Sequence, residues 1–130
     1  MKKTLFLALI LSACTATWEK AARVTEVSAV GSLACDGGQT RQFLQHPESG
    51  EFETNPILGT HPSGYELWTY MGALAFGVIV ANKTLPAWAA TLANLAVTGV
   101  EAVAVRHNIG TGSSMCGLGT FTNPLTEARK

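Results

Sequence analysis

A long apolar stretch, residues 65–107, limits most strongly what this chain can fold into. It is broken only at residues 82–86, where Asn-Lys-Thr-Leu-Pro forms a short turn and Pro86 suits the first position of a new helix. Each of the two apolar runs is near the length of a bilayer span, which takes about 20 residues. Helices joined by so short a turn are antiparallel neighbours. The sequence therefore predicts an apolar antiparallel helical hairpin.

The residues along the first run favour a membrane setting. Trp68 and Tyr70 lie near its start, and such aromatic side chains suit the boundary between lipid and water. Ala73, Gly77 and Ala81 recur every four residues, the pattern with which helices approach closely in membranes. Small residues also occur in any tight helix pair, so this spacing predicts close packing more firmly than it predicts lipid.

The charge of the chain excludes one class of partner. Nine basic and nine acidic residues give a net charge of zero, and no basic block stands out. We therefore expect no nucleic-acid partner. Charged residues make up 14% of the chain, against roughly 25% in ordinary soluble domains. Membrane lipid is the expected partner.

The N-terminus has the form of an export signal. Lys2 and Lys3 precede an apolar core, residues 4–11, which is too short to span a bilayer and fits a secretory signal peptide. Leu-Ser-Ala-Cys, ending at Cys14, resembles the lipobox of bacterial lipoproteins. That resemblance implies a signal peptide over residues 1–13 and a lipid attached to Cys14. The alternative is an ordinary signal peptide with Cys14 incidental. An exported, membrane-anchored location in the cell envelope is expected, in either the inner or the outer membrane.

Residues 14–23 are expected to form a loose leader, and a helix is predicted from about Lys20 to Leu44. Within it an apolar face recurs at spacings of three and four, which indicates a buried or surface-lying amphipathic helix. The glycine pair at 37–38 is expected to weaken, kink or end this helix. Interrupting charges would make it a costly span, so only the hairpin is expected to cross the membrane. The apolar face consists of Val24, Val27, Val30 and Ala34, and the charges are Glu26, Asp36 and Arg41.

The cysteines fit an oxidising compartment. If Cys14 carries lipid, Cys35 and Cys116 remain as an even pair that can form a disulfide. No Cys-x-x-Cys or Cys/His cluster is present, so neither a metal nor a cofactor is expected.

The connector before the hairpin contains proline, glycine and polar residues in a dense run. Ser63 stands three residues before Glu66 and directly before the apolar run, which predicts a capping box at a helix start.

A polar cluster is predicted where the first helix meets the connector. Asp36 and Thr40 share a helix face because they are four residues apart. Glu53 and Asn55 would approach them from the connector. The alternative is that Asp36 and Thr40 belong to a solvated face near a helix end.

Three features together resemble a known group of proteins. They are Asp36-Gly-Gly-Gln-Thr40, Glu53-Thr-Asn-Pro-Ile-Leu-Gly-Thr-His-Pro-Ser63, and Glu101 with His107-Asn108. The pattern resembles a family of short exported membrane proteins of proteobacteria and their phages or prophages, for which no activity is settled. The likeness covers about residues 35–110, and Gly37 stands where the family carries a bulky aromatic residue. It implies an apolar helix pair, and an envelope or phage protein as partner.

We therefore predict an all-α fold, a small bundle of one amphipathic helix and the hairpin. Residues 24–110 form the helical membrane-associated domain and residues 111–130 a loosely ordered tail. The expected function is that of a membrane-associated lipoprotein with a structural or interaction role in the bacterial envelope, without catalysis. The alternative is a membrane-embedded enzyme or metal site, because carboxylates and imidazoles supply ligands and proton carriers. Its residues would be Asp36, Glu53, His61, Glu101 and His107.

Overall fold

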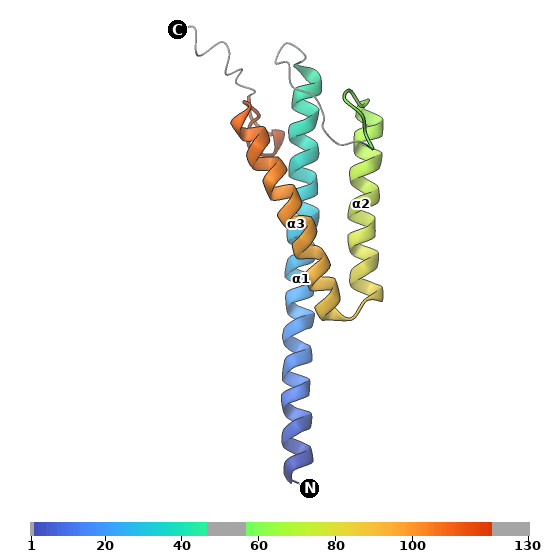
Figure 1. Ribbon diagram of the computed structural model, residues 1–130, viewed down its shortest axis with the longest axis vertical. Helices are drawn as coiled ribbons and strands as arrows, with labels where there is room; N and C mark the ends of the chain where they lie inside the picture. Colours follow the sequence, from blue (N-terminus) through green and yellow to red (C-terminus); the bar gives the residue numbers. More distant parts are fainter. Residues whose placement is uncertain (1, 47–56, 121–130) are drawn as a thin grey trace.

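The computed structural model is a small bundle of three helices and confirms the all-α fold (Figure 1). Helix α1 comprises Lys2–Gln45, α2 Gly64–Thr84 and α3 Ala87–Gly110, and a short 3-10 turn, η2, covers Met115–Gly117. The structure describes residues 2–46 and 57–120, with side chains from residue 16 onward. No strand occurs within those two ranges.

Helix α1 is longer than the sequence predicts. It is 44 residues long, which at about 1.5 Å per residue gives about 66 Å. The expected loose leader, residues 14–23, is helical, since alanine, glutamate, lysine and arginine in that segment are strong helix formers. The glycine pair at 37–38 does not end the helix either. The expectation of a loose leader is wrong, and so is that of a helix end at the glycine pair; the predicted weakening of the helix stays a prediction.

The hairpin flanks α1 instead of closing on itself. In Figure 1, α2 and α3 run along the C-terminal half of α1, and the N-terminal part of α1 projects beyond the α2–α3 turn. Each leg packs mainly on α1 and only slightly on the other leg. Helices α2 and α3 are antiparallel as predicted, but each is held in place mainly by its packing on α1.

The apolar core is correspondingly thin and lies between α1 and α2. Its buried members are one small and one large residue of α1 and three residues of α2. Val97 of α3 and Tyr70 of α2 pack against its edge. The five buried residues are Ala29, Leu33, Leu67, Met71 and Val78.

Most of the predicted valine face of α1 lies outside this core, although Val30 packs against it. Val24 is 60% exposed and Val27 is 74% exposed. The buried face of α1 carries Ala22, Ala29 and Leu33 instead. The predicted face therefore points mainly away from the core.

Across the whole described chain, large hydrophobic residues are more often exposed than buried, and several polar residues are buried. Eight hydrophobic residues are buried, whereas eighteen large hydrophobic residues are exposed. In the most apolar 18-residue stretches of α2 and α3 only 17% of residues are buried. Seven polar residues, in contrast, are buried: Asp36, Gln39, Thr40, Gln42, Thr91, Asn94 and Ser113.

The small-residue stripe on α2 is not the contact between the hairpin legs. Ala73 and Gly77 are exposed, and a Cβ added at Gly77 would meet nothing within 4 Å. The predicted close approach through this stripe is therefore absent within the described chain. The close approaches occur at Gly37 and Gly38 of α1.

The start of α2 follows local sequence chemistry. The Ser63 hydroxyl accepts a hydrogen bond from the Glu66 backbone N–H at 3.2 Å, and the Ser63 N–H donates to Glu66 Oε2 at 2.7 Å. Two helix-terminal donors are satisfied in this way. The structure thus contains the capping box that the spacing of these two residues predicts.

Candidate functional site

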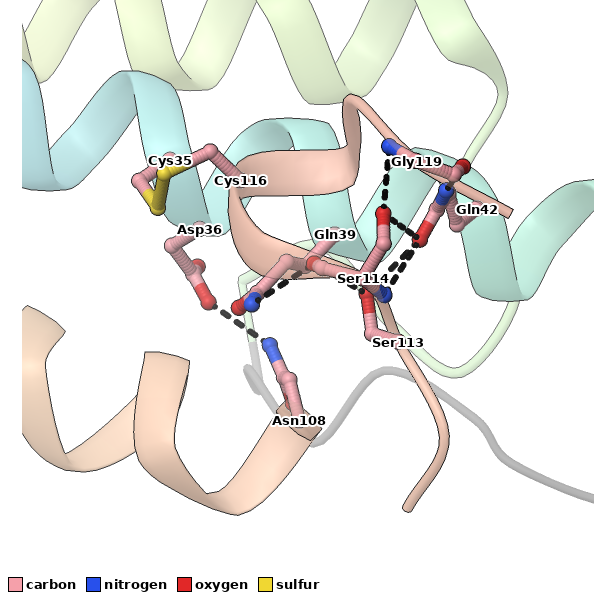
Figure 2. Close-up of a disulfide and its surroundings, with 9 residues drawn as sticks. All are labelled: Cys35, Asp36, Gln39, Gln42, Asn108, Ser113, Ser114, Cys116 and Gly119. Carbon is pink, nitrogen blue, oxygen red and sulfur yellow. Dashed lines mark hydrogen bonds between the residues drawn. A yellow bond between two sulfur atoms is a disulfide. The ribbon is translucent and has the colours of Figure 1, made fainter. Parts of the chain in front are cut away.

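A disulfide ties the chain after α3 to α1. Cys35 of α1 and Cys116 of η2 are bonded at 2.05 Å, across 81 positions of sequence (Figure 2). The segment expected to be a loose tail is therefore ordered in its first half, residues 111–120, and residues 121–130 lie outside the described part. The bridge fixes the end of α3 to the C-terminal half of α1 and is the centre of the candidate site.

Backbone meets backbone beside the bridge. A Cβ added at Gly38 would overlap the carbonyl oxygen of Cys116, and one added at Gly117 would overlap the carbonyl oxygen of Gly38. Cys116 has φ +52° and Gly117 has φ +69°, so the turn is left-handed at both residues. Glycine is required at 38 and 117 because neither backbone can rotate away as a side chain can.

Gly37 makes a second close contact on a neighbouring face. A Cβ there would lie 3.2 Å from Trp68 Cζ3 and 3.2 Å from Met71 Cγ. The indole of Trp68 therefore packs directly on the backbone of α1 at Gly37.

Gln42 is the hub of the polar cluster. Its Oε1 accepts from the Ser113 hydroxyl at 2.9 Å, from the Ser114 N–H at 3.0 Å and from the Ser114 hydroxyl at 3.1 Å. Its Nε2 donates to the Gly119 carbonyl at 2.7 Å. One side chain of α1 therefore holds both ends of the turn that carries Cys116. Figure 2 shows these bonds converging on Gln42.

Gln39 lies about one helical turn before Gln42 on α1, and Asp36 lies nearly two turns before it. The Asn108 amide donates to Asp36 Oδ1 at 2.9 Å, which ties the end of α3 to α1. Gln39 is fully buried and donates to the Ser114 carbonyl at 3.2 Å. Its Oε1 accepts no hydrogen bond in the structure. Buried acceptors are rarely left so, and one small donor such as water would satisfy it.

The structure describes two of the four residues of the predicted polar cluster. Asp36 and Thr40 are both buried, so the alternative of a solvated face is wrong. Glu53 and Asn55 lie outside the described residues. The partners that the structure does describe are Asn108 and the 113–119 segment, and sequence reasoning did not find them.

A second polar network joins all three helices near the α2–α3 turn. The Asn82 and Asn94 side-chain amides bond each other reciprocally at 3.2 Å. Asn94 also donates to Thr25 Oγ1 at 3.2 Å and to the Ala22 carbonyl at 3.3 Å. Asn94 is 1% exposed. In the sequence, the signal for this contact is the polar amide of Asn94 inside a mostly apolar run.

The remaining candidates do not form a site with one another. His61 is exposed on the connector and its Nδ1 is bonded to the hydroxyl of Thr60, and His107 is exposed near the end of α3. Glu101 is half-buried. The described residues contain no group of three histidines, cysteines, aspartates or glutamates that could hold a metal ion. The side chain of Cys14 is outside the described part.

The arrangement is one of structural bonds: a disulfide, a backbone contact between glycines and two amide networks. Comparison with protein families, with curated proteins and with solved structures gives no match to this chain, so its role is argued from this geometry.

Proposed function

We propose that this protein is a membrane-embedded component of the bacterial envelope with a structural or interaction role. The observation that carries the proposal is the inverted distribution of residues, with large apolar side chains outside and polar side chains inside. A soluble bundle of this size would leave a large apolar surface facing water. A bilayer accepts that surface and favours polar groups that bond within the bundle.

The dimensions of the apolar surface support a bilayer. On α2, 17 residue steps separate Glu66 from Lys83, which is about 26 Å of helix. On α3, 18 steps separate Trp88 from Arg106, about 27 Å. The hydrocarbon core of a bilayer is about 30 Å thick. We call this zone the apolar belt, residues 67–82 of α2 and 88–105 of α3. It contains one charged residue, Glu101, which is half-buried.

Charged and aromatic residues lie at both edges of the apolar belt. Near the turn, Glu19, Arg23 and Lys83 line one pocket together. At the opposite edge, Arg41 and Arg106 are exposed. Tryptophans stand at each edge as well, Trp68 at the start of α2 and Trp88 at the start of α3. This is the arrangement of aromatic anchors and flanking charges found at membrane interfaces.

A structural role agrees with the candidate site. Its groups fix three helices to one another, and the described residues offer no metal-binding group in support of the enzymatic alternative. A partner in the envelope, or a phage protein, is the proposed class of contact. A lipid on Cys14 remains a prediction.

A charge placed in the middle of the apolar belt tests the proposal. Val100 lies near the centre of α3 and is 69% exposed, and Met115, outside the apolar belt, is 74% exposed. An arginine at the centre of a span costs about 2.5–3.5 kcal/mol on insertion scales. In a water-soluble bundle either exposed substitution is worth within about 0.5 kcal/mol.

We expect wild type and Met115→Arg to remain with membranes after alkaline carbonate washing and to dissolve in detergent. Val100→Arg should be largely lost from that fraction. Release of the wild type by carbonate, or equal behaviour of both variants in the washed membranes, would show that the apolar belt does not face lipid.

A further inference from the structure

We infer that the disulfide end of the bundle lies outside the membrane and that α1, which unlike α2 and α3 is not apolar enough to span by itself, crosses as a third helix packed on the hairpin, so that Cys14 stays on the cytoplasmic side and carries no lipid. This inference rests on the proposed function, because it gives the orientation of the same apolar belt. Its evidence is the order of the features along α1 and the chemistry of the bridge.

Helix α1 lies alongside the apolar belt and not on its surface. Both hairpin legs pack against its C-terminal half, so residues 26–41 lie at the same depth as the spans (Figure 1). Its charges agree with this position. Asp36 is buried and bonded to Asn108, and Arg41 lies at the disulfide edge. Glu26 lies at the turn edge, in the pocket with Arg23 and Lys83. None of these three charges is placed on the lipid-facing middle of α1.

Cys14 and the disulfide lie beyond opposite edges of the apolar belt. The α2–α3 turn is level with Glu19–Glu26 of α1, as their shared pocket shows. Cys14 precedes Glu19 on the same continuous helix and lies further from the apolar belt on that side. The bridge to Cys116 lies at the other end, beside the ends of α1 and α3.

A lipid on Cys14 and a stable disulfide therefore require opposite orientations. Lipoprotein lipid is attached after export, so it would place the turn end outside and the bridge in the cytoplasm. Disulfides persist in oxidising compartments and are rare in the cytosol. Since the structure contains the bridge, we place the bridge outside and the turn inside.

The basic residues agree with this orientation. Lys20, Arg23 and Lys83 lie at the turn end, and Lys2 and Lys3 begin the projecting part of α1 on the same side. At the disulfide end the described arginines and lysines are Arg41 and Arg106. Cytoplasmic segments carry an excess of lysine and arginine, so the turn end suits the cytoplasm. Arg129 and Lys130 fall in the undescribed tail and do not enter this comparison.

The chain has three cysteines, and the number that react with a reagent confined to the outside reports the orientation. Intact spheroplasts expressing the full chain are treated with a membrane-impermeant phosphine reductant and a polyethylene glycol maleimide, which adds a visible mass for each thiol. We expect two adducts in intact spheroplasts, none without reductant, and three after the membrane is dissolved with reductant present. Cys14→Ser is the matched control, with two adducts in both preparations, and radiolabelled palmitate should not enter the wild type.

Other outcomes overturn the inference, and carbonate extraction shows whether the proposed function falls with it. Palmitate on Cys14, with no adduct in intact spheroplasts and two after dissolution, reverses the orientation. Three adducts in intact spheroplasts place the whole chain outside. Two adducts in both preparations with a shortened N-terminus show that a signal peptide is cleaved. If the protein resists carbonate in any of these cases, only the orientation is wrong, and if carbonate releases it, the membrane-embedded role is wrong as well.

Discussion

Replacing Gly38 by alanine should weaken the disulfide, although the same change elsewhere on α1 should stabilise the helix. A Cβ at Gly38 would overlap the carbonyl oxygen of Cys116, whereas one at Gly31 would meet nothing within 4 Å. Gly31→Ala is therefore a matched control on the same helix. Both changes gain about 1 kcal/mol of helix propensity, and only Gly38→Ala displaces the turn that carries Cys116.

The displacement can be given a size. Forcing extra atoms into a packed contact typically costs about 1–3 kcal/mol. The upper half of this range is expected here, because backbone faces backbone on both sides and no side chain can rotate away. In the reduced protein the turn can move off α1, so the strain enters the equilibrium between dithiol and disulfide. Since about 1.4 kcal/mol is a factor of ten, about 2–3 kcal/mol should lower the oxidation equilibrium about 30- to 140-fold.

The assay is the oxidised fraction of detergent-solubilised protein in a series of thiol–disulfide redox buffers, read by maleimide mass shift on gels. Gly31→Ala should follow the wild type, and Gly38→Ala should need more oxidising buffers. If the two variants oxidise together, the contact between Gly38 and the Cys116 carbonyl does not constrain the turn, and the explanation of this glycine is wrong.

Two further changes test the amide networks by thermal unfolding in detergent. Gln42→Leu removes the acceptor of the Ser114 N–H and the donor to the Gly119 carbonyl, which should lower stability by about 1–3 kcal/mol, while exposed Gln45→Leu should change it little; equal stability of the two would show that Gln42 is not the hub. Asn94→Leu removes the donor to Asn82 Oδ1, while Asn82 Nδ2 keeps its bond to the Val78 carbonyl. The change should cost about 1–2 kcal/mol, whereas Asn82→Leu combined with Asn94→Leu removes both amides and should recover part of the loss. A double variant less stable than the sum of its singles would contradict the reciprocal pairing.

The helices were predictable because their determinants are local. Length, apolar runs, Pro86 and the Ser63–Glu66 spacing act over a few residues, and they placed α2 and α3 close to their observed bounds. The burial of α1 was not predictable in the same way. Periodicity identifies an apolar face, but it does not say whether that face meets a core or a lipid, and Val24 and Val27 face outward. To predict which face of α1 is buried, one must know whether the outside of the bundle meets water or lipid.

The site was less predictable because its partners are far apart in sequence. Asp36 meets Asn108 across 72 positions, and Gln42 meets Gly119 across 77. Nothing in the spacing of these residues specifies such pairings. The bridge could be named because only three cysteines are present. The function of Gly38 could not be predicted. From sequence alone a glycine inside a helix indicates a weak point, and only the structure shows that the Cys116 backbone packs against it.

The separation of the bridge cysteines has a consequence for how the chain is made. Cys35 is synthesised 81 residues before its partner, so at about 5–20 residues per second it waits for several seconds as a free thiol. During that interval Cys14 is the other thiol available in the chain. In the inferred orientation the bilayer keeps Cys14 in the cytoplasm while Cys35 emerges on the far side. The membrane itself then prevents a bond between Cys14 and Cys35. The Cys35–Cys116 bridge forms only after α3 has crossed the bilayer.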